Sequence, residues 1–150
     1  MGLDMYLRGK KFLWSHGDQN FREIAKNLLV QAFPEVAELE VNELSCEVAY
    51  WRKANAIHNW FVKNTQDGVD ECQNTPVDRE QLQALLDDIN KVFDDKSLAS
   101  EILPTKSGFF FGDTSYDEGY FEDLAYTKER LELILRPDYS DWSFEYSSSW

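Results

Sequence analysis

The stretch ELSCEVAYWRKANAIHNWFVK, residues Glu43–Lys63, carries two structural periods in succession. Apolar and polar residues alternate from Leu44 to Tyr50, which predicts a half-buried strand. From Trp51 onward, apolar residues recur every three or four positions, which predicts a helix over roughly 51–64. A strand that leads directly into an amphipathic helix favours a fold containing both kinds of element.

Alternation recurs elsewhere and predicts further strands. Residues 3–8 and 142–146 alternate between apolar and polar side chains. Gly9-Lys10 is expected to turn the first of these strands into a second short strand over residues 12–14. The segment Gly108–Gly112, which encloses three phenylalanines, is expected to form a short buried strand.

Helical spacing predicts three further helices, with apolar stripes over residues 21–32, 82–93 and 120–135. Their expected N-terminal caps are Asp18, Thr75 or Asp78, and the capping box Ser115–Glu118. Short alternating strands favour antiparallel pairing with one solvated face. We therefore expect a single α+β domain over residues 1–150, with an antiparallel or mixed sheet of about four short strands packed with about four helices.

The net charge of −13 is unevenly distributed. Residues 1–66 hold eight basic and eight acidic side chains, whereas residues 67–150 hold seven basic and twenty acidic ones. Phosphate contacts need cations, so direct nucleic-acid binding is disfavoured. The acidic half is either a solvated surface that aids solubility or a docking surface for a basic partner.

The expected location is the bacterial cytoplasm. No apolar run approaches the roughly 20 residues that span a bilayer, and the first residues lack the apolar core of a signal peptide. In that compartment Cys46 and Cys72 are expected to be free thiols.

The start of the predicted 51–64 helix suggests an anion-binding site. It has no good capping residue, and Arg52 and Lys53 place cations where the helix dipole disfavours them. A bound anion would accept the free N–H groups and neutralise both cations. Trp51 would stack on a nucleotide base, and Asn55 would contact phosphate or ribose. The alternative is structural: carboxylates pair with the cations, and a neighbouring segment occupies the N–H groups.

Three more residues join this candidate ligand site, although each has a plain structural role open to it. His58 lies on the apolar face of the same helix and would orient the ligand, or it is a core histidine bonded through one nitrogen. Ser107 and Asp113 flank the phenylalanine run, which is itself typical of a core. The chain contains no recognised nucleotide, zinc, calcium or catalytic motif, so we expect neither metal nor cofactor.

Several blocks resemble small accessory proteins of bacteriophages and prophage regions. They are AYWRKANAIHNWFV over residues 49–62, GLDMYL at the start, LPT with SGFFFG over 103–112, and the terminal SSW. The resemblance carries over no activity and no binding residues. It implies an accessory protein made in a bacterial cytoplasm, of a kind that often inhibits host functions.

Three functions are therefore expected, in decreasing order of support. The first is a non-enzymatic binding protein that sequesters an anionic small molecule, such as a nucleotide signal, and so inhibits a host function. The second is an acidic inhibitor that docks residues 67–150 on a basic, nucleic-acid-binding host protein. The third is a small enzyme that uses His58 with Asp113 or Asp117, which requires these groups to converge.

Overall fold

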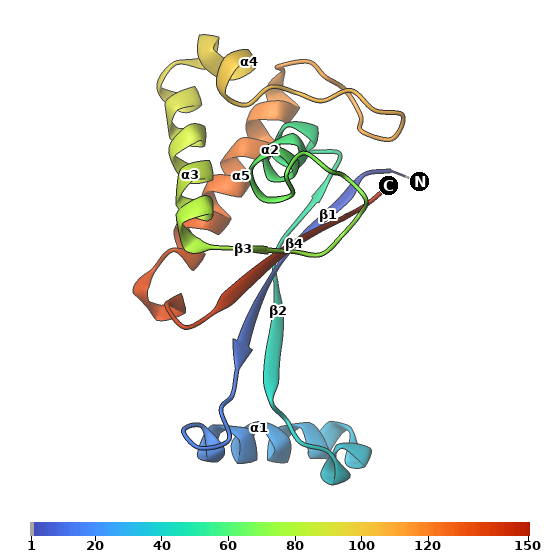
Figure 1. Ribbon diagram of the computed structural model, residues 1–150, viewed down its shortest axis with the longest axis vertical. Helices are drawn as coiled ribbons and strands as arrows, with labels where there is room; N and C mark the ends of the chain where they lie inside the picture. Colours follow the sequence, from blue (N-terminus) through green and yellow to red (C-terminus); the bar gives the residue numbers. More distant parts are fainter. Residues whose placement is uncertain (1) are drawn as a thin grey trace.

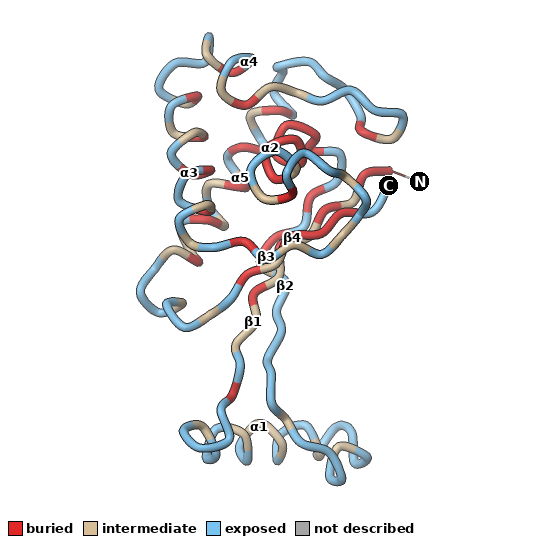
Figure 2. Tube along the Cα trace, in the orientation of Figure 1, coloured by how far each residue is buried: buried red, intermediate tan, exposed pale blue. Residues whose placement is uncertain are grey.

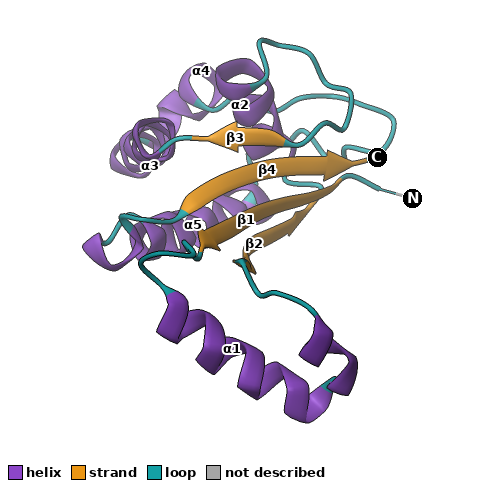
Figure 3. Ribbon diagram, turned by 60° about the horizontal axis from the view of Figure 1, so that its bottom comes forward, coloured by secondary structure: helices purple, strands orange, loops and turns teal. Residues whose placement is uncertain are grey.

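A four-stranded antiparallel sheet lies at the centre of the protein, in a computed structural model that describes residues 2–150. Its strands run in the order β2-β1-β4-β3, and every pairing is antiparallel. Figure 3 shows the twisted sheet with helices packed against it. The expected α+β domain is confirmed. The strands are β1 (Asp4–Phe12), β2 (Glu43–Arg52), β3 (Thr75–Val77) and β4 (Ser143–Ser149).

Alternation along the strands gives the sheet one buried face. Leu3, Met5 and Leu7 are fully buried, while the side chains between them point to the other, wetter face. Four helices cover the buried face and share one apolar core with it (Figures 1 and 2). They are α2 (Asn55–Thr65), α3 (Arg79–Asp94), α4 (Ala99–Ile102) and α5 (Glu118–Ile134).

A fifth helix, α1 (Gln19–Ala32), connects β1 to β2 but lies apart from this core. It buries none of its side chains, and a short 3-10 turn over Pro34–Glu38 follows it. In Figure 1 it lies beyond the far end of the β1–β2 hairpin, away from the other helices. Two further 3-10 turns, Lys96–Leu98 and Pro137–Tyr139, connect elements within the body.

The expected turn at Gly9-Lys10 is wrong, because β1 continues through it to Phe12. Lys10 pairs with Ser45 on one side and with Ser143 on the other. A Cβ on Gly9 would lie 3.2 Å from the ring of Trp142. Gly9 therefore serves the close packing of side chains over the strand, and no chain reversal occurs there.

Two helix starts differ from the prediction. The helix expected from residue 51 begins at Asn55, because Trp51 and Arg52 pair with β1 as the last residues of β2. The cap of α5 is Asp117, whose carboxylate accepts the N–H of Tyr120, two residues beyond the expected Ser115.

The helix α3 follows the sequence pattern more closely. Asp78 is its cap, and Gln81 completes a capping box with it.

The segment expected as a buried strand, 108–112, lies instead in an irregular loop that spans residues 103–117. Phe109 is 95% exposed, whereas Phe111 is buried in the core. The loop crosses the start of α2 and reaches α5. It forms one wall of the cavity described next.

Candidate functional site

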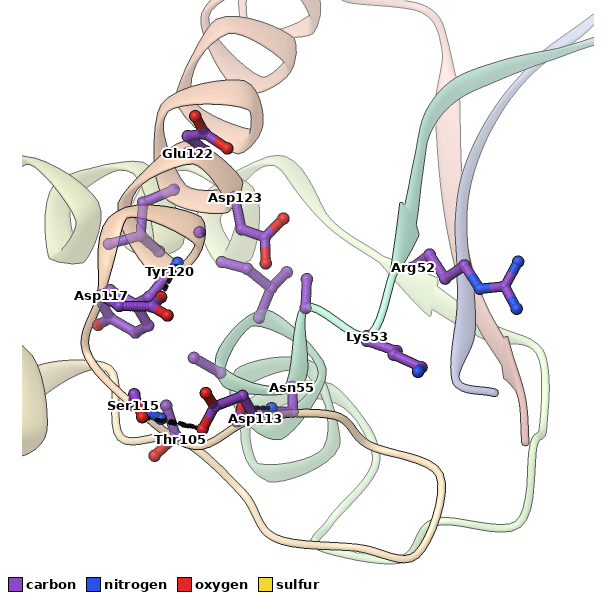
Figure 4. A pocket seen from close by; sticks show the side chains of 15 residues that line it. Arg52, Lys53, Asn55, Thr105, Asp113, Ser115, Asp117, Tyr120, Glu122 and Asp123 are labelled. Carbon is purple, nitrogen blue, oxygen red and sulfur yellow. Dashed lines mark hydrogen bonds between the residues drawn. The ribbon is translucent and has the colours of Figure 1, made fainter. Parts of the chain in front are cut away.

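A cavity of about 280 Å³ lies between the start of α2, the first turns of α5 and the 103–117 loop. This volume is at the lower end of the range for small-molecule sites, roughly 300–1,000 Å³. Figure 4 shows the side chains that line it. Four predicted site residues are among them: Arg52, Lys53, Asn55 and Asp113.

Helix α2 begins at this cavity without a side-chain cap. Its N-cap position is Ala54, which has no group that accepts a hydrogen bond from the first turn. The N–H of Asn55 donates to Lys53 O at 2.8 Å. Within residues 2–150, the N–H groups of Ala56 and Ile57 have no acceptor. Both residues line the cavity, so two unsatisfied donors lie at its wall.

The strand-to-helix junction has an unusual backbone. Lys53 has a positive φ of 62°, which is uncommon for a residue other than glycine. Its N–H donates to Leu3 O at 2.8 Å, which fixes the junction to the edge of the sheet. Gly112 packs against it from the loop, and a Cβ there would lie 3.0 Å from the Cβ of Lys53.

Asn55 holds the loop over the start of α2. Its Nδ2 donates to Phe111 O at 3.0 Å and to Asp113 O at 2.7 Å. Its Oδ1 accepts from the N–H of Lys106 at 2.9 Å. These three bonds occupy the buried amide, so Asn55 is a positioning residue and does not present the phosphate or ribose contact expected from the sequence.

The two cations at the junction point away from the cavity. Figure 4 shows the side chains of Arg52 and Lys53 extending to the opposite side from the carboxylates. Neither cation has a carboxylate within 4.0 Å in the described chain, so the expected ion pairs with the acidic half are absent there.

Carboxylates line the cavity instead. Asp113 accepts bonds from the N–H and hydroxyl of Ser115, and Asp117 caps α5. Asp123 reaches into the space from α5, and among residues 2–150 no donor binds its carboxylate. Burial, and then the charges of Glu122 and Asp117, raise the pKa of Asp123 to about 6. The wall facing α2 is therefore acidic.

Trp51 does not line the cavity. As a β2 residue it points into the core, where it is only 3% exposed. Its ring contacts Phe61 and Tyr126, and its Nε1 donates to Thr127 Oγ1 at 2.8 Å. The stacking role expected for Trp51 is not available in this geometry. Ser107 is exposed on the loop and also lies outside the cavity wall.

His58 does not line this cavity and is buried, at 1% exposure. Its Nδ1 is 2.7 Å from the Tyr146 hydroxyl, and its Nε2 is 2.8 Å from Asp70 Oδ2. The neutral ring satisfies both contacts when Tyr146 donates to Nδ1 and Nε2–H donates to Asp70. Burial lowers the pKa of His58, against the opposing effect of Asp70.

Both nitrogens of His58 are thus bonded, where the sequence suggested one. The residue lines a different cavity from Asp113 and Asp117, next to Asp70 and Phe111. The convergence that the enzyme hypothesis requires is not found. His58 ties α2 to β4 and to the loop before β3.

Asp123 and Asp117 complete the site and were not predicted as ligand residues. Asp117 was expected only as an alternative partner of His58 in the enzyme hypothesis, and Asp123 has no local sequence signal because it lies on the polar face of α5. Across the described chain, no three histidine, cysteine or acidic side chains are placed to hold a metal ion. None of the helices in residues 2–150 is both long and apolar enough to cross a bilayer.

Comparison with protein-family models, with curated proteins and with solved structures gave no match to this chain.

Proposed function

We propose that this chain is a non-enzymatic binding protein. Its ligand is a small molecule that binds in the cavity between α2 and α5 and carries a hydrogen-bond acceptor at one end and a donor at the other. One observation carries the proposal: unsatisfied donors and an unsatisfied acceptor lie at the wall of the same cavity. The donors are the N–H groups of Ala56 and Ile57, and the acceptor is the carboxylate of Asp123.

The α2 side of the cavity suits a ligand group that accepts hydrogen bonds. Unpaired N–H groups at a helix start, together with the dipole of α2, favour a phosphate, carboxylate or carbonyl oxygen. Ala54 supplies no competing side chain there. The charges of Arg52 and Lys53 add a positive potential near this end without direct contact.

The α5 side suits a ligand group that donates hydrogen bonds. Asp123 is ionised at pH 7.5, given its pKa of about 6, and has no partner of its own. An amino group or a nucleobase edge with two N–H donors would bind it through charge-assisted bonds. A nucleotide carries both kinds of group, so nucleotides are the first class of ligand to test. In this geometry the base would face the carboxylates of α5 and the phosphate would face the start of α2.

The resemblance to phage accessory proteins supports sequestration as the role of such a site. In this proposal the protein acts in the cytoplasm of an infected bacterium and inhibits a host function by removing its signal. Among the described residues that line the cavity, the one hydroxyl bonded to a carboxylate is that of Ser115, which donates to nearby Asp113 as a local turn contact, and no histidine lines the cavity; this favours binding over turnover.

Thermal unfolding with a ligand panel tests the proposal. The panel contains purine and pyrimidine mononucleotides, cyclic dinucleotides, nucleosides, amino acids and inorganic phosphate. A ligand at about 100 times its Kd would stabilise the protein by about 2.7 kcal/mol. We expect a nucleotide to raise Tm and its nucleoside or phosphate alone to raise it less. No shift with any member of the panel would contradict the proposal.

Two variants and one comparison variant sharpen the test. Asp123→Asn removes the acceptor, and Ala56→Pro removes one donor at a first-turn position that tolerates proline. Both should weaken binding by roughly tenfold, the effect of about 1.4 kcal/mol. Arg52→Ala is the comparison variant: its side chain points away from the cavity, so only its long-range potential is lost and a smaller loss of binding is expected. A large loss in Arg52→Ala with none in Asp123→Asn would favour the anion site expected from the sequence.

Docking of residues 67–150 on a basic host protein stays an alternative prediction. It would give a complex that weakens steeply with added salt. A partner recovered under those conditions, without any ligand effect on Tm, would favour it over the cavity.

A further inference from the structure

The end of the β1–β2 hairpin exposes a large apolar surface. We define it as the arm tip, residues 12–42, which contains α1 and the 3-10 turn after it. Figure 2 shows that nearly all of this segment is exposed or half-buried. Eight large apolar side chains within it are between 37% and 67% exposed: Phe12, Trp14, Phe21, Ile24, Leu28, Leu29, Phe33 and Leu39.

The area of this surface matches one side of a stable protein interface. The four aromatic side chains, Phe12, Trp14, Phe21 and Phe33, each expose roughly half of about 200 Å², which gives about 450 Å² together. The four aliphatic side chains, exposed between 37% and 63%, add to this area. A standard interface buries about 800 Å² on each partner. The arm tip therefore exposes the amount of apolar surface that a dimer of ordinary size covers.

The apolar stripe of α1 faces outward because the polar face of the helix contacts the rest of the chain. Phe21, Ile24 and Leu28 share one face of the helix at spacings of three and four residues. The opposite face is the one that contacts the returning chain: Arg22 Nε donates to Val41 O at 2.8 Å, and Arg22 also pairs with Glu40 at 3.1 Å. The helix is thus anchored through its polar side, which leaves the stripe uncovered.

The two cations of α1 are already paired within the chain. Glu40 lies 3.1 Å from Arg22 and 3.9 Å from Lys26, the two cations of α1. No strong charge of one sign remains on the stripe to select an oppositely charged partner. An uncharged helix face of this kind is complementary to a copy of itself, packed antiparallel across a twofold axis.

The position of the arm tip also favours a second copy. Residues 67–150 carry a net charge of −13, from seven basic and twenty acidic side chains, whereas the arm tip carries −3, from two basic and five acidic ones. Figure 1 places residues 67–150 in the body, away from α1. Two copies that meet at their arm tips keep these acidic halves at opposite ends of the assembly. A basic partner would be drawn to the acidic body instead, and an anionic membrane would repel it.

We propose that this chain forms a symmetric homodimer through α1, in which the Phe21–Ile24–Leu28 stripe of one copy packs on the same stripe of a second copy. The ligand cavities would then face outward at the two ends. This inference does not depend on the proposed function, because no residue of the arm tip lines the cavity.

Light scattering on the intact chain, at roughly 10–100 µM, tests the dimer, because interfaces of this size have dissociation constants of micromolar or below. We expect twice the chain mass of 17.6 kDa. Phe21→Glu with Leu28→Glu should give a monomer. Because both side chains are 63% exposed in the single chain, the far-UV spectrum should be unchanged. Ile24→Lys provides a second, independent disruption.

Phe109→Glu is the matched control. Phe109 is 95% exposed but lies in the body on the 103–117 loop, so this variant should stay dimeric. A wild-type monomer at these concentrations would overturn the proposal, as would a dimer that survives the double substitution. Binding of the wild-type monomer to a host protein or to lipid vesicles, lost in the double variant, would overturn it in favour of that occupant.

Discussion

Replacing Asp123 with asparagine should stabilise the protein at pH 7.5 and leave its stability nearly unchanged at pH 4. The pKa of Asp123 rises from an ordinary value of 3.8 to about 6 in the fold, chiefly through burial. Between these values the folded chain holds more protons than the unfolded chain, so this group makes stability fall as pH rises. The full difference is worth about 3 kcal/mol, and partial exposure reduces it to about 1–2 kcal/mol. Asparagine does not titrate and avoids this loss.

Urea unfolding of both proteins at pH 4 and pH 7.5, followed by tryptophan fluorescence, measures this effect. The asparagine variant should gain about 1–2 kcal/mol at pH 7.5 relative to its difference at pH 4. Glu129→Gln is the control, since this carboxylate lies on the same helix, is exposed and is not among the groups that raise the pKa of Asp123. A variant that is less stable at pH 7.5 would mean that the α2 N–H groups stabilise the Asp123 carboxylate. That result would refute the argument that the acceptor is unsatisfied.

Two other perturbations test the frame around the cavity. His58→Asn should make the free energy of unfolding depend less on pH. The pKa of His58 in the fold lies below its ordinary value of 6.5, so the stability that neutral His58 contributes is fully present above pH 6.5. That stability is lost as the pH falls through the lowered pKa, and asparagine has no such titration. Urea unfolding between pH 5 and 8 measures this, with exposed His16→Asn expected to behave as wild type. Asn55→Ala should cost about 2–4 kcal/mol, because three buried hydrogen bonds to the loop are lost. Amide hydrogen exchange should become faster in residues 103–117. Unchanged exchange there would contradict the conclusion that Asn55 holds this loop in place.

Local patterns predicted the elements whose stability is local. The first part of β1, up to residue 8, and the helix capped by Asp78 followed from period and capping alone. The loop over 103–117 did not, because its course depends on Asn55, a residue about 50 positions away that binds its backbone. The sequence also did not predict that α1 is exposed, since an apolar stripe has the same pattern whether it packs on its own core or on a partner.

The cavity lies at the junction that the sequence indicated, but its wall is acidic rather than basic, and the cause is the position of one helix boundary. A helix from residue 51 would place Arg52 and Lys53 in its first turn, beside the free N–H groups. In the structure residue 52 still belongs to β2, where successive side chains point to opposite faces. Trp51 therefore turns into the core and Arg52 turns away from it. The helix start moves to Asn55, which faces α5 and its carboxylates. The same uncapped helix start thus lies opposite acceptors rather than among cations, and this is why the proposed ligand carries both donors and acceptors instead of an anionic group alone.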